Sequence, residues 1–343
     1  MNPAEINIPT IPTLHPEKPR DYPISPRENL MRALNCEKPL WMPNLDLDSQ
    51  ISPALAYGDM APSMFEDSAD WFGTQYKYSA VQGTSTPEKG VFNEIKEWRE
   101  KVKWPDFDKW DWKQGYADFV RDESKALCIM YGYGIWEKLY VFEGFEQAFI
   151  DLALEPEECR EFFERMADHK IGLFQRLNDV YHYDWVSYHD DYGTSHTQFF
   201  SVDMWKEIIF PPTLRIINAL KDMGTKVIFH NCGHIEPFIP WLIDEFHSDG
   251  LWLQPQVNDF EKLVKTYGDR TAIYYQPDIF TMYDPDTTPD QARAYARHIV
   301  DTCGAHANPG PGAVMASYAL REDVWHAFND EIYEYSLNKY RGI

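Results

Sequence analysis

The sequence predicts an α/β protein built as a (β/α)8 TIM barrel. From about residue 125 onward, short apolar runs alternate with amphipathic stretches of roughly ten to twenty residues, a pattern typical of parallel strands joined by helices. With two strands expected earlier in the chain, about eight such units fit into 343 residues, and a TIM barrel takes roughly 250. Neither a GxGxxG nor a GxxxxGK[ST] loop occurs, so no motif supports an open nucleotide-binding sheet.

Residues 1–24 are expected to form an extended arm. Their six prolines exclude a helix or an internal strand, and the arm would lie on the body of the protein or on a partner subunit. A helix should follow, because Ser25 suits the N-cap, Pro26 the first helical position and Glu28 a capping box. We expect residues 25–343 to form a single TIM-barrel domain.

The first two strands are expected in a less regular region. Apolar residues suggest a buried strand in PLWMPN, residues 39–44, and a second one near Trp71–Tyr78. Residues 61–115 hold five of the twelve tryptophans among many charges, which is too polar for a core and too aromatic for a disordered linker. We expect this segment to be an aromatic-rich insertion or lid near the barrel mouth; the alternative is a surface subdomain that only packs.

The later elements are expected to alternate regularly. The expected strands lie at residues 125–134, 183–191, 225–233, 248–254, 271–276 and 305–310. The expected helices lie at residues 136–154, 156–181, 204–223 with a break at 210–212, 234–245, 259–269, 289–304 and from about 321 onward. Functional groups of a barrel follow the carboxyl ends of its strands, so the residues at those ends are the candidates for chemistry.

Charge and composition exclude several partners. The chain has 32 basic and 55 acidic residues, a net charge of −23, which repels nucleic-acid phosphates and anionic membrane surfaces. Its apolar runs are far shorter than a membrane span, and its first residues lack a signal-peptide pattern. Five scattered cysteines imply no disulfide framework. We expect a cytoplasmic protein, with a proline-rich arm and an insertion that would suit a homodimer.

Two clusters at strand ends carry the candidate catalytic chemistry. In VSYHDDYG, Asp190 and Asp191 are adjacent carboxylates that repel each other, so one would stay protonated and serve as an acid. The alternative is that one caps the following helix while the other faces solvent. In FHNCGHIEP, His230 and Cys232 can present two ligands to zinc, or they are a structural histidine beside a buried cysteine. His189 is a further candidate acid, or else a core imidazole.

Aromatic and amide side chains at the expected strand ends are candidate substrate contacts. Aromatic rings there would sandwich a planar substrate, although ordinary packing explains each ring equally well. The candidates are Trp41, Asn44, Trp136, Tyr192, Trp252, Gln254 and Gln276.

These blocks, taken in order, resemble the uroporphyrinogen decarboxylase superfamily. The resemblance rests on HDDYGTS through FIPWLIDE (189–245), on GYGIWEKLYVFEG upstream and on AHANPGPG downstream, and it covers roughly residues 25–335. It implies a TIM barrel, in agreement with the strand count. The superfamily includes decarboxylases of uroporphyrinogen, which need no cofactor. It also includes methyltransferases that move a methyl group between a substrate and the cobalt corrinoid of a partner protein.

The resemblance favours the methyltransferase branch. The decarboxylases carry an arginine-rich MRQAGR segment that binds substrate carboxylates, whereas the corresponding WMPNLDLDSQ has no arginine. Aspartates at the mouth (Asp46, Asp48, Asp190 and Asp191) would repel a polycarboxylate. The chain is therefore similar to the first component of a corrinoid-dependent O-demethylase. Such an enzyme takes a methyl group from a small donor, in our reading an aromatic methyl ether, and passes it to a corrinoid-binding protein.

The resemblance also implies zinc, held by His230, Cys232 and a third cysteine. Pro311 stands where that cysteine is expected, so the sequence identifies two ligands only. With an incomplete zinc site, Asp190, Asp191, His230 and His189 are the candidates for protonating the leaving group. Two other functions stay open: a corrinoid-free decarboxylase or lyase of a small acid that uses the aspartate pair, and a barrel that binds a ligand without chemistry.

Overall fold

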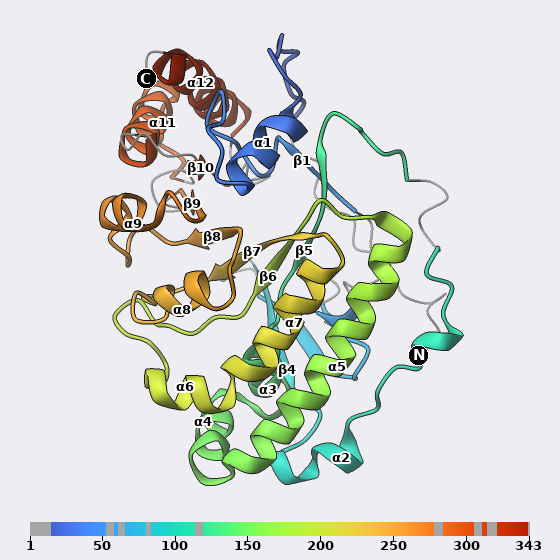
Figure 1. The fold of residues 1–343 in the computed structure, drawn as a ribbon. Coiled ribbons are helices and arrows are strands. Elements are labelled where there is room, and N and C mark those ends of the chain that lie inside the picture. Colours follow the sequence, from blue (N-terminus) through green and yellow to red (C-terminus); the bar gives the residue numbers. More distant parts are fainter. Residues whose placement is uncertain are drawn as a thin grey trace.

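The centre of the molecule is a parallel β-sheet (Figure 1). The computed structural model describes residues 15–52, 58–60, 66–79, 84–113, 119–277, 284–304, 311–313 and 321–341. Within these residues, seven strands pair in the order β1-β5-β6-β7-β8-β9-β10, and every pairing is parallel. The strands are β1 (Ser49–Ile51), β5 (Ala126–Tyr131), β6 (Trp185–His189), β7 (Lys226–Asn231), β8 (Gly250–Leu253), β9 (Ala272–Tyr275) and β10 (Pro311–Ala313). The α/β class is confirmed, and closure into an eight-stranded barrel stays a prediction.

Helices connect the strands and pack on the sheet (Figure 1). They are α1 (Pro26–Leu34), α2 (Trp98–Lys101), α3 (Ile135–Glu143), α4 (Phe145–Leu154), α5 (Pro156–Tyr181), α6 (Val202–Ile208), α7 (Phe210–Asp222), α8 (Ile239–Asp244), α9 (Phe260–Tyr267), α11 (Pro289–Gly304) and α12 (Glu322–Arg341). None of those helices has both the length and the hydropathy needed to cross a bilayer.

Two of the expected helices are divided in the structure. The helix expected at 136–154 is split into α3 and α4 by Gly144, whose φ of +98° is readily adopted only by glycine. The break expected at 210–212 is present, because α7 begins at Phe210 with prolines in its first turn.

The two N-terminal strands expected for the barrel were placed wrongly. Residues 39–44 form no strand of the parallel sheet, because the prolines in this segment supply no N–H group. At the end of the segment a turn begins, in which the carbonyl of Asn44 accepts the amide of Asp48 at 2.8 Å. The first strand is instead β1. The region near Trp71–Tyr78 contributes β3 (Gln75–Ser79) to a separate antiparallel sheet with β2 (Ser68–Ala69) and β4 (Thr84–Lys89). The connections between β2, β3 and β4 are too short to join parallel strands, which need a crossover of a dozen or more residues.

A further strand, β10, lies directly after the range in which the last strand was expected. Residues 305–310 lie outside the described residues, and β10 starts at Pro311, where it pairs with β9.

Buried ion pairs connect the segment between β1 and β5 to helices α3 and α5. Lys138 of α3 donates to Asp70 at 3.1 Å, and both side chains are fully buried. His169 of α5 lies 2.7 Å from Asp59, again out of contact with water. Tryptophans of this segment pack with one another and with α5, for example Trp98 against Phe162. The segment is therefore docked in a fixed place on α3 and α5.

The described end of the N-terminal arm lies on α12. Residues 15–22 contain no helix or strand, and both Lys18 and Arg20 bind Asp330, at 2.6 and 2.7 Å. Tyr22 stacks on Trp41 with ring centroids 5.2 Å apart. Residues 1–14 of the expected arm lie outside the described residues.

The packing of the sheet decides which side chains face its interior. One buried cluster contains alternate residues of neighbouring strands, among them Trp185, Ile228, Trp252 and Tyr274, together with α1. The larger cluster fills the space between the sheet and the outer helices. Strand alternation then places His189 and His230 on the same side as Trp185 and Ile228, toward the interior.

Candidate active site

Three inward-facing rings meet at the carboxyl ends of β6, β7 and β8. His230 lies between its partners in the sheet, paired with His189 of β6 and with Trp252 of β8. Its ring centroid is 4.3 Å from that of His189 and 4.3 Å from that of Trp252, and the outer two rings are 5.2 Å apart. Because both neighbours contact its ring, His230 is held in one orientation.

A potential metal site adjoins this ring cluster. Asp191, His230 and Cys232 each offer one ligand atom, and those atoms lie within 4.8 Å of one another. The Sγ atom of Cys232 is 3.3 Å from Nε2 of His230, and the backbone N–H of Cys232 donates to Oδ1 of Asp191 at 2.6 Å. The three residues will be called the metal triad.

The local backbone explains why the metal triad forms. Gly233, at φ +83°, turns the chain directly after Cys232 and comes against the backbone of Gly193, so closely that a Cβ atom on Gly233 would lie 2.3 Å from Gly193. The amide of His234 donates to the carbonyl of Thr194 at 2.7 Å, which joins the same two loops. The segments that follow β6 and β7 are thereby drawn together, and Asp191 reaches Cys232.

The electrostatics of the metal triad suit a bound cation. Burial lowers the pKa of His230, although the charge of Asp191 raises it, so the imidazole is the neutral form that binds metals. Burial and the charge of Asp191 raise the pKa of Cys232 well above its usual value. Within the described part of the chain no lysine or arginine pairs with Asp191. A cation between these groups would offset that penalty and favour the thiolate.

The two adjacent aspartates have separate environments. Asp190 is fully buried, and its carboxylate accepts the backbone N–H groups of Trp136 and Glu137 at 3.4 and 3.0 Å and the hydroxyl of Tyr192 at 3.0 Å. Burial raises its pKa to about 7. Asp190 therefore caps a helix, as the structural alternative expected, but the helix is the preceding one, α3. Asp191 does not face solvent freely; it is half-buried in the metal triad. The catalytic role of Asp190 stays a prediction.

The side chain of His189 forms a hydrogen bond with another residue of its own strand, β6. Its Nε2 atom lies 2.7 Å from the hydroxyl of Ser187, two residues earlier. Burial, together with the neighbouring His230, moves its pKa well below the usual value. This imidazole therefore stays neutral near pH 7 and supports His230.

Of the expected substrate contacts, Trp252 and Gln254 lie at the metal triad, and Gln276 follows the next strand of the sheet, β9. Trp252 contacts His230, and Oε1 of Gln254 accepts the N–H of Gly233 at 2.8 Å, which fixes the turn after Cys232. Gln276 follows β9, and its buried Oε1 atom accepts no hydrogen bond from the described residues.

The other four expected contacts are buried elsewhere. Trp136 packs against Phe149 and Phe200, and Tyr192 binds Asp190; neither side chain is exposed. Trp41 packs against Tyr333, and Asn44 donates to Asn329 at 2.6 Å, both in α12. The latter pair precedes β1 instead of following it, so the structure does not bring Trp41 or Asn44 to the carboxyl ends of the strands. The same correction applies to Asp46 and Asp48.

Sequence reasoning missed Glu137, a buried acid beside the metal triad. Its carboxylate accepts the hydroxyl of Tyr140 at 2.9 Å. Burial and the charges of Asp191 and Asp190 raise its pKa well above its usual value. Glu137 occupies the third position of α3, where a glutamate is expected for helix capping, so the sequence offered a structural explanation and no functional one.

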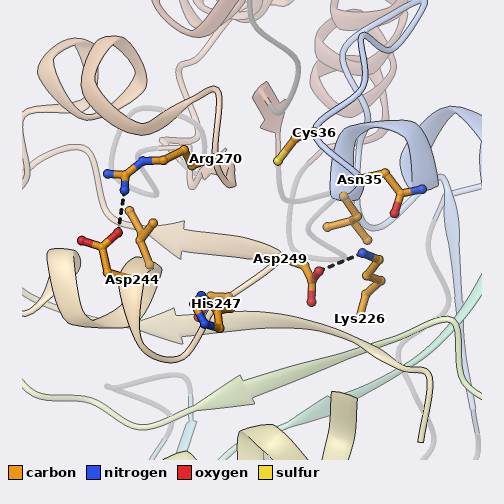
Figure 2. Close-up of a pocket in the computed structure, with 10 residues that line it drawn as sticks. Asn35, Cys36, Lys226, Asp244, His247, Asp249 and Arg270 are labelled. Carbon is orange, nitrogen blue, oxygen red and sulfur yellow. Dashed lines mark hydrogen bonds and ion pairs between the residues drawn. The ribbon is translucent and has the colours of Figure 1, made fainter. Parts of the chain in front are cut away.

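Two cavities lie away from the metal triad. A cavity of about 360 Å³ opens at the amino ends of β7–β9, and its two cations, Lys226 and Arg270, are paired with Asp249 and Asp244 (Figure 2). Residues at this end of a parallel barrel contribute to stability rather than catalysis. A second cavity, of about 590 Å³, lies between β4 and the junction of α3 and α4 and includes Tyr140.

Comparison with known proteins gives one family. The family model described as "Uroporphyrinogen decarboxylase (URO-D)" matches residues 136–317, just over half of the chain. This range includes the metal triad, His189, Trp252 and Gln254. No curated protein matches the chain.

Several solved structures are similar at a low level. A glycosylated endo-β-1,4-xylanase of family GH10 from Gloeophyllum trabeum aligns with a TM-score of 0.36 at 10% identity, over 61% of this chain and 86% of that one. Old Yellow Enzyme from Pichia sp. AKU4542 aligns with a TM-score of 0.36 at 7% identity, over 62% and 67%. An endo-1,4-β-xylanase from Caldicellulosiruptor owensensis gives 0.34 at 11% identity, over 65% and 75%. Similarities this weak carry no argument about function.

Proposed function

The chain belongs to the uroporphyrinogen decarboxylase family, and we propose that within it the protein is a corrinoid-dependent methyltransferase. It takes a methyl group from a small donor, in our proposal an aromatic methyl ether, and passes it to a corrinoid carried by a partner protein. The observation that supports this most directly is the metal triad of Asp191, His230 and Cys232 at the carboxyl ends of β6 and β7. A thiolate, an imidazole and a carboxylate are the ligand types of catalytic zinc, which acts as a Lewis acid on a bound oxygen atom.

The residues of the metal triad fit zinc. One thiolate, one neutral imidazole and one carboxylate give three protein ligands, and a catalytic zinc site keeps its fourth position for substrate or water. The family resemblance implies a third ligand, a cysteine, at the position of Pro311. In our proposal Asp191 takes the place of that cysteine. Zinc in this position would supply a positive charge beside the donor's oxygen atom.

The protein's own residues would orient both metal and donor. His189 and Trp252 fix the ring of His230, and Gln254 fixes the turn that carries Cys232. The Oε1 atom of Gln276, to which none of the described residues donates, is available to an O–H or N–H group of the donor. In the reaction, the reduced corrinoid supplies the electron pair that takes the methyl group, and the donor's oxygen keeps the pair of the broken C–O bond.

Decarboxylation of a polycarboxylate is poorly supported. The groups gathered at this end of the sheet include three acids: Asp191 lies beside His230, Asp190 caps α3, and Glu137 follows in the first turn of α3. In the described part of the chain no arginine is paired with them. A substrate that carries several carboxylates would be repelled. A lyase that acts on a small acid through Asp190 is the second candidate, favoured by the pKa near 7 of that buried carboxyl.

The expected partner is a corrinoid-binding protein with a basic face. The net charge of −23 would attract such a face and speed encounter. We place the reaction in the cytoplasm, where the five cysteines, all of them unpaired in the structure, would stay reduced.

The function is tested by spectroscopy under strict exclusion of oxygen. Purified protein is mixed with chemically reduced cob(I)alamin and with methoxyaromatics, methylamines and small carboxylic acids in turn. The proposal expects the cob(I)alamin band to disappear and methylcob(III)alamin to form with a methoxyaromatic donor. Release of carbon dioxide from an acid, with cob(I)alamin unchanged, would support the lyase and contradict methyl transfer.

A further inference from the structure

Tyr133 has a backbone conformation that only a supporting structure can maintain. It follows β5 within the sequence Gly-Tyr-Gly and has φ +60°, in the left-handed region that disfavours residues with a Cβ atom. Glycine lies on both sides of it, and yet the position with this conformation carries a tyrosine. Strain of this kind persists where surrounding contacts over-determine the backbone, and it gathers at functional sites.

A buried lysine holds the backbone of Tyr133. Lys170 of α5 is fully buried, and its Nζ atom donates to the carbonyl oxygen of Tyr133 at 2.7 Å and lies 3.5 Å from Asp59. Because burial outweighs the charge of Asp59, the pKa of Lys170 is lowered to about 8. Placing a lysine ammonium in the protein interior is costly. In return, the hydrogen bond from Lys170 fixes the backbone position of Tyr133.

The ring of Tyr133 is also fixed. It stacks on Tyr76 of β3 with centroids 6.2 Å apart and planes at 20°, and the ammonium of Lys138 lies 5.8 Å from its centroid. Tyr76 itself is anchored, since its hydroxyl donates to Asp70 at 3.2 Å. Backbone and ring together fix the direction of the Tyr133 hydroxyl.

The residue that follows Tyr133 packs directly against the aspartate pair: a Cβ atom on Gly134 would lie 2.1 Å from Cγ of Asp190, the neighbour of Asp191. Burial raises the pKa of Tyr133, as do the charges of Glu137, Asp70 and Asp191, so Asp191 of the metal triad lies within its electrostatic range. The phenol therefore keeps its proton at neutral pH. In the described part of the chain its hydroxyl makes no hydrogen bond, and the side chain is half-buried rather than sealed in the core.

We infer that Tyr133 is a catalytic residue that donates a hydrogen bond to the leaving oxygen of the methyl donor. The inference rests on the proposed methyl transfer. In that step the C–O bond of the ether breaks, the methyl group goes to the reduced cobalt of the partner, and the bonding pair remains on oxygen as a phenolate. Tyr133 stabilises this new charge, and the phenolate takes its proton from water.

The test compares Tyr133→Phe with the wild-type protein on methoxybenzenes whose phenol products differ in pKa. For the poorest leaving group we expect methyl transfer to cob(I)alamin to slow by about 10²–10³-fold, the usual cost of removing one such donor. The loss should shrink steadily as ring substituents make the leaving phenol more acidic. Tyr335→Phe, which removes a tyrosine hydroxyl from the exposed side of α12, is the matched control and should keep the wild-type dependence on leaving group.

A second readout needs no corrinoid. Titration of the demethylated phenol product into the protein should give a dissociation constant about tenfold higher for Tyr133→Phe than for wild type, because one hydrogen bond is lost. An equal loss of rate with every leaving group, or unchanged phenol binding, would assign Tyr133 a structural role and overturn the inference alone. Failure of the wild-type protein to methylate cob(I)alamin from any donor would overturn the proposed function and this inference together.

Discussion

The two ends of the parallel sheet differ in whether their buried carboxylates have cationic partners. At the amino ends, two buried carboxylates meet cations and backbone N–H groups. Asp184, which precedes β6, binds Arg27 at 2.6 Å and Arg121 at 3.2 Å and also accepts the amide of Leu127. Asp249, which precedes β8, binds Lys226 at 2.9 Å (Figure 2).

At the carboxyl ends of β6 and β7, an acid, a histidine and a cysteine meet, and no lysine or arginine of the described residues forms an ion pair with them. Asp191, His230, Cys232 and Glu137 lie together, and among the described ion pairs none involves Asp191 or Glu137. Such an arrangement is unfavourable for stability unless a cation or substrate completes it. The difference indicates that the amino ends stabilise the fold and the carboxyl ends are built for a ligand.

The largest expected effect comes from the metal triad. Cys232→Ser removes the thiolate, so we expect zinc content to fall from one per chain toward zero and methyl transfer to drop by at least about 10³-fold. Cys36→Ser at the amino-end cavity is the matched control and should change neither value. Zinc content and rate are measured on the same samples. Full zinc occupancy in the Cys232 variant would contradict the claim that the carboxyl ends of the strands hold the zinc.

The reverse experiment acts on the amino end. Asp184→Ala leaves Arg27 and Arg121 without their carboxylate, and because both cations are partly exposed we expect a loss of about 2–4 kcal/mol in the free energy of unfolding. Urea denaturation measures this loss. Zinc content per folded molecule should stay unchanged, and a loss of zinc would show that the two ends are coupled.

The pH dependence of the unfolding free energy should distinguish Asp48, which has no ion pair in the described residues, from Asp184 and Asp249. Burial raises the pKa of Asp48 to about 7, well above its value in the unfolded chain. The folded state therefore holds more protons between pH 4 and 7, and the contribution of Asp48 to stability is present below pH 4 and is lost as pH rises through 7. Asp48→Asn should flatten the fall in unfolding free energy between pH 5 and 7. An unchanged slope would place the pKa of Asp48 near its ordinary value.

The smallest effect is expected at an exposed ion pair. Arg293 binds Asp290 at 2.7 Å on the surface of α11, where the Asp290 side chain is 94% exposed. Asp290→Asn should change the unfolding free energy by less than about 0.5 kcal/mol. Thermal denaturation of this variant beside Asp184→Ala calibrates how much burial contributes; a loss as large as that of Asp184→Ala would contradict the role given to burial.

Much of the fold and part of the site could be predicted from the sequence. The helix from Pro156 to Tyr181 has the predicted bounds, because its proline start and apolar stripe are local signals. His230 and Cys232 were found because they lie at the carboxyl end of a strand with a clear apolar run. Trp41 and Asn44 were misplaced because a short strand at Ser49–Ile51 has little hydrophobic pattern of its own.

The remaining features depend on contacts between distant segments. Asp191 meets Cys232 through the close approach of Gly193 and Gly233, which no local pattern reveals. Asp190 turns away from Asp191 because the first turn of α3 offers it two backbone N–H groups. Tyr133 is held by Lys170, 37 residues later in the chain. Residue types alone identify such groups, but only the packing shows which of them meet.

The most direct test of the central claim is X-ray absorption at the zinc edge on the purified protein. The account predicts one zinc per chain with a single sulfur neighbour at about 2.3 Å and nitrogen or oxygen neighbours at about 2.0–2.2 Å. Substitution of Asp191 by alanine should keep the sulfur neighbour and remove one oxygen. Absence of zinc, or a zinc shell without sulfur, would contradict the assignment of Asp191, His230 and Cys232 as its ligands.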